Sequence, residues 1–310
     1  MMEQNQRLED LIVVTCYFNP ESYIARRRNY EAFASHLEDM GVPLFTVECA
    51  FGDQAFELPT SRSTLQVRSR SVLWQKERLL NIAIRRAPTE FSKIAWVDAD
   101  LLFENPMCFQ LASQALNGFS VVQLFDMVSR LPRDQREYTD DCTSWKGFAA
   151  RIHAAPGCHR KGWFRHGHTG YGWAARRDVL LKCGLFDKCV SGGSDHLMAH
   201  AFVGDWYSDC IDDLVGLGSV LHHSFRKWAR SMHKSVLGNV GYVPGRVLHL
   251  WHGDDANRSY HKWSQEMKRC TVDPNLDLAD NADGCLEWTG RNIPIQNWSS
   301  GLFPSRREDG

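Results

Sequence analysis

The chain has 310 residues, of which 43% are hydrophobic and 24% are charged, and its formal net charge is −1 at pH 7. This composition is typical of a globular protein. The near-zero net charge argues against broad electrostatic binding to nucleic acid, but it does not exclude a local basic patch. The first ten residues lack the apolar core of a signal peptide, and no apolar run is long enough to span a membrane. We therefore expect a cytoplasmic protein whose ten cysteines are free thiols.

Short apolar runs alternate with helical patterns along the first part of the chain. Strands are expected over residues 11–20, 42–51, 94–103 and 119–125, and helices over residues 29–41 and 73–88. Asn19 and Pro20 favour a turn after the first strand, and Pro88 closes the second helix. The alternation predicts an α/β fold, in which a mainly parallel, Rossmann-like sheet is flanked by helices in one large domain.

The pattern changes over residues 126–169, which are polar and charged and lack clear periodicity. An irregular segment of this length in a compact domain is often a lid or a binding element. Cys158, His159, His166 and His168 lie within it, and a metal site is one interpretation of this group. A solvated polar loop is the preferred interpretation, because the spacing fits no standard zinc template. Helical patterning returns after this segment, over residues 175–184 and 195–203.

Two carboxylates end the apolar run of IAWVDADLLF, residues 94–103. In an open α/β sheet, ligands bind beyond the carboxyl ends of the strands, and backbone alternation can turn Asp98 and Asp100 toward one spot. Neighbouring carboxylates are costly unless a cation compensates them, and two hard oxygen donors suit Mg²⁺ or Mn²⁺ that carries a diphosphate. A solvated polar turn is the alternative for this motif taken alone.

Two further motifs carry candidate functional groups. His249 and His252 lie three residues apart after an apolar run, and imidazoles together with carboxylates make a site for Mn²⁺. The alternative is a structural or surface histidine pair. In the segment GGSDH, residues 192–196, two glycines allow a ligand to approach the backbone closely. Asp195 then either caps a helix or acts as a general base toward an attacking hydroxyl.

In this order the motifs resemble those of a GT-A fold glycosyltransferase. Over residues 11–265 the chain resembles the β-1,4-galactosyltransferase family and its bacterial and viral relatives. KERLLNIAIRRAP and FSKIAWVDADLLFENP are similar to the helix and the metal-binding strand of that family, and TGYGWAARRDVLLKCGLFD to its Gly-rich strand and following helix. GGSDH resembles the Gly-Gly-Glu-Asp motif, with Ser194 in place of Glu. Val190 and Ser191 precede the glycines, where the family has a Trp.

The resemblance implies a role for each matching residue. Asp100 would bind the metal, and Asp98 would face the ribose or a water on the metal. His252 would be a metal ligand, as would His249 three residues before it. Asp195 would be the catalytic base. The nucleotide would be bound by Phe18, Asn19, Pro20, Trp74 and Lys76.

The implied activity is that of an inverting hexosyltransferase that uses Mn²⁺ or Mg²⁺ and a UDP-type sugar donor. Residues 1–125 would form the nucleotide-sugar-binding half, with Trp74 packed on the uracil. Residues 126–270 would form the acceptor-binding and catalytic half, and residues 271–310 a tail that wraps the domain. The three consecutive arginines at 26–28 either contact the phosphates or form an exposed basic helix start.

The sequence leaves the acceptor and two other classes of function open. Acceptors under consideration are a glycan, a lipid-linked sugar, a protein and a modified base in DNA, which viral relatives glycosylate. A flipped-out base would suit the basic and aromatic residues around Trp145, Trp163 and Phe164. A nucleotide-sugar hydrolase or a nucleotidyltransferase would use the same carboxylates with a metal and a diphosphate. A non-catalytic module that binds a nucleotide-sugar or a metal is the third possibility.

Overall fold

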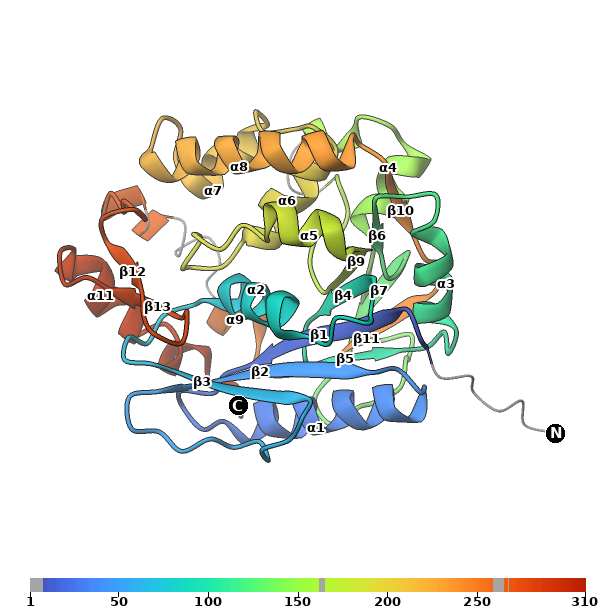
Figure 1. Ribbon diagram of the computed structural model, residues 1–310, viewed down its shortest axis with the longest axis horizontal. Coiled ribbons are helices and arrows are strands. Elements are labelled where there is room, and N and C mark those ends of the chain that lie inside the picture. The colour runs from blue at the N-terminus through green and yellow to red at the C-terminus, as the bar shows by residue number, and fades with distance from the viewer. Residues whose placement is uncertain (1–7, 162–164, 259–264, 267) are drawn as a thin grey trace.

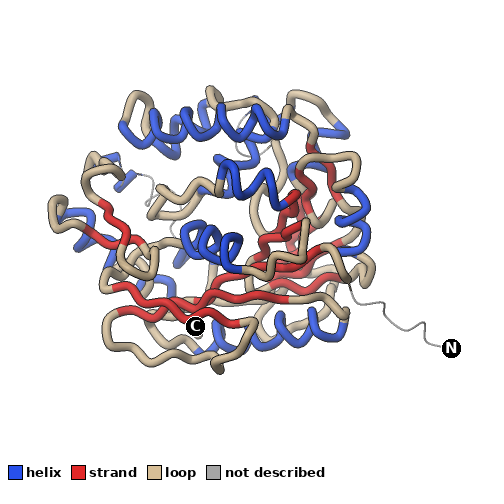
Figure 2. Tube along the Cα trace, in the orientation of Figure 1, coloured by secondary structure: helices blue, strands red, loops and turns tan. Residues whose placement is uncertain are grey.

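A seven-stranded sheet crosses the molecule and has helices on both of its faces (Figures 1 and 2). The computed structural model describes residues 8–161, 165–258, 265–266 and 268–310. From one edge to the other, the strands are β10 (Val240–Tyr242), β6 (Val121–Gln123), β9 (Gly172–Arg176), β4 (Lys93–Val97), β1 (Leu11–Tyr17), β2 (Leu44–Phe51) and β3 (Thr64–Ser69). Every pairing is parallel except the two that β9 makes. The predicted α/β fold with a mainly parallel sheet is confirmed.

Two smaller sheets complete the β-structure. The first consists, in order, of β5 (Leu101–Phe103), β11 (Arg246–His249), β7 (Met127–Arg130) and β8 (Thr143–Lys146). The second pairs β12 (Leu278–Asp280) with β13 (Leu286–Trp288). The long helices are α1 (Ile24–Asp39), α2 (Lys76–Arg86) and α8 (Val220–Val236). The shorter ones are α3 (Cys108–Ala115), α4 (Phe148–Ala154), η1 (Cys158–Lys161), α5 (Arg177–Cys183), α6 (Ser194–Phe202), α7 (Asp209–Val215), α9 (Asp255–Arg258), α11 (Ile293–Ser300) and η2 (Pro304–Arg306).

The large sheet is buried on both faces, which explains why its central strands read as continuous apolar runs. Side chains of β1 alternate between two cores: Ile12 and Val14 pack with α2, whereas Leu11 and Val13 pack with α1 and α3. Figure 1 shows α1 beneath the sheet, α2 and α5 above it, and α8 outermost at the top. This layering leaves the carboxyl ends of β1 and β4 free for a site.

The expected single strand over residues 94–103 is wrong, because the chain changes sheets within it. β4 ends at Val97 in the large sheet, and the N–H of Asp98 donates to the carbonyl of Tyr171 (2.8 Å). β5 begins at Leu101 and pairs with β11 in the other sheet. Apolar periodicity cannot reveal this change, because the residues on both sides of the break are buried.

Residues 126–169 contain more regular structure than their sequence indicates, and the interpretation of Cys158, His159, His166 and His168 as part of a solvated polar loop is wrong. The described part of this segment contains β7, β8, α4 and η1, and its His159 and His166 are buried. These elements are too short to produce a clear period in the sequence. β3 and α8 were likewise not predicted, although α8 buries an apolar stripe at helical spacing that includes Leu221, Phe225 and Met232.

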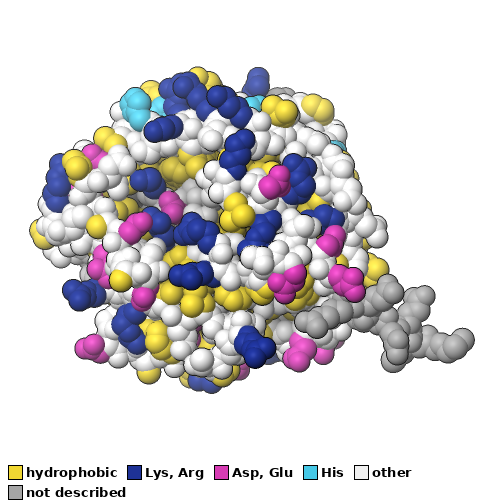
Figure 3. Space-filling model, in the orientation of Figure 1, with side chains coloured by type: hydrophobic (Ala, Val, Ile, Leu, Met, Phe, Trp, Pro, Cys, Tyr) yellow, Lys and Arg dark blue, Asp and Glu magenta, His cyan; other side chains and the backbone are white. Residues whose placement is uncertain are grey.

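The surface that Figure 3 displays mixes Lys and Arg with Asp and Glu over most of its area. A group of basic side chains lies along the top, in the region of α8. Within the described ranges, no helix is both long enough and apolar enough to cross a membrane. This face thus presents no broad single-sign field, in line with the net charge of −1.

A buried guanidinium closes the carboxyl end of α2. Arg177, the first residue of α5, is 8% exposed. It donates hydrogen bonds to the carbonyls of Ile84 (3.3 Å), Ala87 (2.7 Å) and Pro88 (2.5 Å). The last carbonyls of a helix have no partners within the helix, so a cation at this position is favourable. Arg177 thereby ties the end of α2 to the junction between β9 and α5.

We expect Arg177→Met to lower the free energy of unfolding by about 2–4 kcal/mol, because it leaves several buried carbonyls without donors. The matched control is Arg176→Met, whose side chain is 46% exposed and lies 3.3 Å from Asp178 Oδ1. The control should change the free energy of unfolding by less than about 0.5 kcal/mol. Urea denaturation of the three proteins measures both effects. Equal losses in the two variants would contradict a capping role for Arg177.

Candidate active site

A cavity of about 620 Å³ opens at the edge of the large sheet where β1 and β4 end. These strands are parallel, so their carboxyl ends meet at one edge, which is where ligands bind in open α/β sheets. The other walls come from the first turns of α2 and α6, the end of β11 and the loop before β9. The sequence-predicted residues that line it are Phe18, Trp74, Lys76, Asp98, Asp100, Asp195, His249 and His252.

Asp100, His249 and His252 meet because β5 and β11 pair in an antiparallel register that sets Leu101 opposite His249. The N–H of Leu250 also donates to the backbone carbonyl of Asp100 (2.9 Å). The Oδ2 atom of Asp100 lies 3.1 Å from His252 Nε2 and 3.7 Å from His249 Nε2. The two imidazole nitrogens are 3.2 Å apart. Three potential metal ligands thus converge on one point of the cavity wall.

This donor set fits a divalent cation. Ligand atoms about 2.1 Å from an octahedral ion lie about 3 Å apart in neighbouring positions. The observed separations of 3.1, 3.2 and 3.7 Å require only small side-chain rotations to reach that geometry. One carboxylate oxygen with two imidazole nitrogens suits Mn²⁺ or a similar borderline ion, and three protein ligands leave coordination positions for a substrate.

Glu308, near the C-terminus, supports this group from behind. It is fully buried, and its Oε1 lies 3.5 Å from His252 Nδ1, on the side of the ring away from Asp100. Arg26 contacts both of its oxygens (2.5 and 2.9 Å), and Arg306 contacts one (2.5 Å). Burial alone would raise the pKa of Glu308, but the two guanidinium groups hold it well below its usual range. A carboxylate here favours the His252 tautomer that presents Nε2 to a cation.

The sequence gives no signal for Glu308, because a Glu within a charged terminal segment ordinarily reads as solvated. Its position depends on contacts between the C-terminal segment and residues near the N-terminus, such as Arg26. Arg26 belongs to the three arginines that precede the helical pattern, and it lines the cavity. Arg27 and Arg28 instead form exposed pairs with Glu31 and Asp134.

A single ammonium group links two other carboxylates of the cavity. Lys76 is the first residue of α2, and its Nζ lies 3.0 Å from Asp98 Oδ1 and 2.6 Å from Asp195 Oδ2. Its neighbour Glu77 lies 3.8 Å from the same nitrogen and is buried. The ends of β4, α2 and α6 are therefore joined by ion pairs around Lys76. Asp98 and Asp100 share a turn but face different partners.

Burial changes the protonation of this carboxylate group. It raises the pKa of Asp98 to about 7, against the opposing effect of Lys76 and with help from the charges of Asp195 and Asp100. Burial likewise raises the pKa of Glu77 to about 8. Perturbed carboxyl groups that converge in a cavity are a common property of catalytic sites.

Two glycines let Asp195 reach its position. α6 begins after Gly193, which has φ +90°, so neither Ser194 nor Asp195 is the N-cap of this helix. A Cβ atom on Gly193 would lie 2.4 Å from a side-chain carbon of Leu214, and one on Gly170 would lie 3.3 Å from Asp195 Oδ2. At Gly193 the close neighbour is the side chain of Leu214, and the approach of a ligand to the backbone at GGSDH stays a prediction. The capping alternative for Asp195 is excluded.

Aromatic rings form one wall of the cavity. The ring of Trp74 is nearly parallel to that of Phe303, with centroids 6.2 Å apart, and Phe18 meets it edge-on at 5.5 Å. The guanidinium of Arg306 lies 5.1 Å from the centre of the Trp74 ring. Residues of the C-terminal segment thus help to shape the wall that contains Trp74 and Phe18.

Asn19 and Pro20 are not among the residues that line the cavity. Asn19 is buried, accepts a hydrogen bond from the N–H of Tyr23 (2.9 Å) and donates one to its carbonyl (3.0 Å). It thereby shapes the turn from β1 into α1. A direct contact of either residue with a nucleotide stays a prediction.

The opposite wall comes from the segment between β6 and β9. Tyr171 stacks between His168 (centroids 4.0 Å apart) and His249 (4.8 Å). Trp145 lies nearby, is 37% exposed and carries the guanidinium of Arg130 5.0 Å from its ring centre. Sequence reasoning did not assign a role to Tyr171. Trp163 and Phe164, named with Trp145 as aromatic candidates, lie outside the described residues.

Three solved structures illustrate what the chain is similar to. The catalytic domain of Drosophila β-1,4-galactosyltransferase 7 with xylobiose is 12% identical, covers 61% of this chain and has a TM-score of 0.34. Glucosyl-3-phosphoglycerate synthase from Mycobacterium tuberculosis, with Mg²⁺ and UDP, is 12% identical over 90% of this chain and 87% of its own (TM-score 0.40). Mannosyl-3-phosphoglycerate synthase from Rubrobacter xylanophilus is 10% identical over 90% and 83% (TM-score 0.42).

This chain spans 59% of the length of the Drosophila galactosyltransferase domain. No protein-family model and no curated protein sequence matches it. TM-scores below 0.5 are too low to assign an activity, so the function is argued from the residues of the cavity.

We expect Glu77→Gln to flatten the pH dependence of stability. The folded chain keeps a proton on Glu77 up to a pKa of about 8, whereas the unfolded chain loses it near its ordinary value of about 4.3. The free energy of unfolding therefore falls as the pH rises through this window. Between about pH 6 and pH 8 the wild type should lose about 2 kcal/mol more than the variant.

Urea denaturation at each pH measures this difference, and titrating groups remote from Glu77 cancel because both proteins share them. Glu90→Gln, at an exposed position, is the control and should reproduce the wild-type profile. Parallel profiles for wild type and Glu77→Gln would show that Glu77 is ionised in the folded protein.

Proposed function

We propose that the protein is a metal-dependent glycosyltransferase that moves a sugar from a UDP-type donor to an acceptor hydroxyl with inversion. One observation carries the proposal. A single cavity at the carboxyl edge of the parallel sheet holds a cation donor set, Asp100 with His249 and His252, beside a separate carboxylate, Asp195. Sugar transfer from a nucleotide needs three functions close together, which are to hold the diphosphate, to bind the nucleoside and to activate the acceptor.

The first function is to hold the diphosphate. Mn²⁺ or Mg²⁺ bound by the donor set would neutralise negative charge on the diphosphate leaving group. Glu308 fixes the orientation of His252 for this purpose, as carboxylates behind metal-bound histidines generally do. Arg26 and Arg306 line the same side of the cavity and add positive charge for the phosphates.

The second function is to bind the nucleoside. The wall of Trp74 and Phe18 offers a flat apolar surface for a uracil ring, and Arg306 beside it favours a negatively charged ligand. Asp98 lies on the same edge and would hydrogen-bond the ribose or a water molecule near it. With a pKa of about 7, Asp98 can act as donor or acceptor at neutral pH.

The third function is to activate the acceptor. Asp195 lies at the start of α6, inside the cavity, and would accept the proton of the acceptor hydroxyl as that oxygen attacks the anomeric carbon. Lys76, 2.6 Å away, holds the carboxylate in place. Attack from the face opposite the diphosphate inverts the anomeric centre. Trp145 also lines the cavity and would offer an aromatic face to the acceptor.

The nucleotide site is tested by calorimetric titration of UDP with and without Mn²⁺. We expect binding that requires the metal, and Asp100→Ala and His252→Ala should each weaken it at least about 10- to 100-fold, because they remove ligands rather than their supports. Asp178→Ala and His223→Ala, at exposed positions, are the matched controls and should bind like the wild type. UDP binding that is indifferent to Mn²⁺ and to both ligand substitutions would refute the metal clamp.

The general base is tested with Asp195→Asn on the acceptor found in a screen of glycans, lipid-linked sugars, proteins and modified DNA. We expect kcat to fall by about 10²- to 10⁴-fold, while the affinity for UDP and Mn²⁺ stays within about threefold. Unchanged kcat would remove Asp195 from the chemistry. Release of free sugar without glycosylation would instead favour a nucleotide-sugar hydrolase, and nucleotide transfer products would favour a nucleotidyltransferase. A protein that reacts with no donor would favour the non-catalytic binding module.

A further inference from the structure

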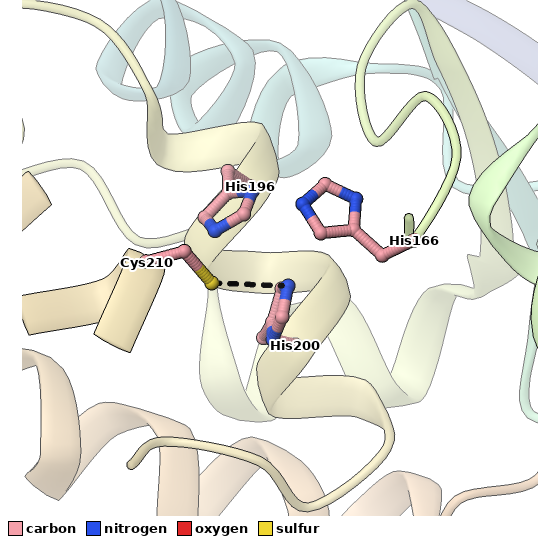
Figure 4. Close-up of side chains that lie close together, drawn as sticks. All are labelled: His166, His196, His200 and Cys210. Carbon is pink, nitrogen blue, oxygen red and sulfur yellow. Dashed lines mark hydrogen bonds between the residues drawn. The ribbon is translucent and has the colours of Figure 1, made fainter. Parts of the chain in front are cut away.

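A second group of metal-type ligands lies beside the cavity and is not used in the proposed reaction. It consists of His166 from the loop before β9, His196 and His200 from α6, and Cys210 from α7 (Figure 4). All four residues are buried, and their ligand atoms lie within 4.8 Å of one another. His196 and His200 are four residues apart and therefore share one face of α6. Figure 4 shows the three rings and the sulfur directed toward a common centre.

The outer nitrogens of two of these rings are already engaged. His200 Nδ1 lies 2.9 Å from Asp205 Oδ2, and Asp205 in turn accepts hydrogen bonds from Ser208 and the N–H of Tyr207. His166 Nδ1 lies 2.8 Å from the carbonyl of Gly167. In both rings this leaves Nε2 as the nitrogen that points into the group. A histidine held by a carboxylate or a carbonyl on its far side is the usual arrangement around a protein-bound metal.

We propose that His166, His196, His200 and Cys210 bind one Zn²⁺ ion in a closed tetrahedral site. Ligands of tetrahedral zinc, with Zn–N of about 2.0–2.1 Å and Zn–S of about 2.3 Å, lie about 3.3–3.6 Å apart. His200 Nε2 and Cys210 Sγ are 3.9 Å apart, and no pair of ligand atoms exceeds 4.8 Å, so modest side-chain rotation closes the site. Three nitrogens and one sulfur select zinc, whereas Asp100 with His249 and His252 suits a harder ion.

Four protein ligands leave no position for a substrate, so this zinc has a structural role. It would join three segments, the loop before β9, α6 and α7, through one ion. His196 directly follows Asp195, and both His166 and His196 line the cavity. The ion would thus fix the start of α6, and with it the Asp195 carboxylate, relative to the cavity wall. The zinc site does not depend on the proposed function and is tested without any activity measurement.

The test is the zinc content of purified, chelator-washed protein by mass spectrometry. We expect one Zn²⁺ per chain in the wild type and less than about a tenth of that in Cys210→Ser and in His200→Ala. There are two controls. Cys183→Ser removes a thiol that lies outside the group, at the end of α5, and His252→Ala removes a candidate ligand of the other metal site. Both controls should retain one zinc. A wild type without zinc, or zinc lost equally from His252→Ala, overturns the proposal.

Cobalt substitution tests the ligand set in the wild-type fold. Protein that is stripped of metal and reloaded with Co²⁺ should show the intense visible bands of tetrahedral cobalt and a sulfur-to-cobalt charge-transfer band in the near ultraviolet. Cys183→Ser should keep the charge-transfer band, which excludes Cys183 as its source, whereas Cys210→Ser should lose it. Absence of that band from Co²⁺-loaded wild type overturns the proposal.

Discussion

The break between β4 and β5 is the constraint on which the cavity depends. The chain leaves the large sheet after Val97 and enters the second sheet at Leu101, so the intervening turn stands where the two sheets meet. Asp98 thereby faces Lys76 and α6, whereas Asp100 faces the histidines at the end of β11. Had the strand continued, both carboxylates would belong to one ladder, and the register that brings His249 to Asp100 would not exist.

The placement of these carboxylates requires that their negative charges be compensated. The carboxylates around the cavity are compensated in two separate groups, one around Lys76 and one around the guanidinium pair that holds Glu308. Removing one partner from such a buried group is far more costly than breaking a surface pair, because it leaves an uncompensated charge. The same groups set the protonation of Asp98 and Glu77 and the tautomer of His252. Fold and candidate chemistry therefore depend on the same ion pairs.

The sequence predicts those parts of the site that lie at the ends of its elements. Asp98 and Asp100 follow a strand-like run, and Asp195 and His249 adjoin recognisable patterns, so their meeting at one sheet edge could be anticipated. Glu308 could not, because its burial depends on a chain terminus that closes over residues near the beginning. The zinc ligands had a partial signal: the spacing of His196 and His200 on a predicted helix indicates a shared face, but nothing links it to His166 and Cys210.

The most direct test of the account is a crystal structure of the protein soaked with Mn²⁺ and UDP, with anomalous difference density measured at the manganese edge. The proposed function predicts one strong peak among Asp100 Oδ2, His249 Nε2 and His252 Nε2, with diphosphate oxygens completing its coordination and the uracil against Trp74. Density for UDP at another place, or a manganese peak away from these three atoms, would contradict the assignment of this cavity as a metal-dependent nucleotide-sugar site.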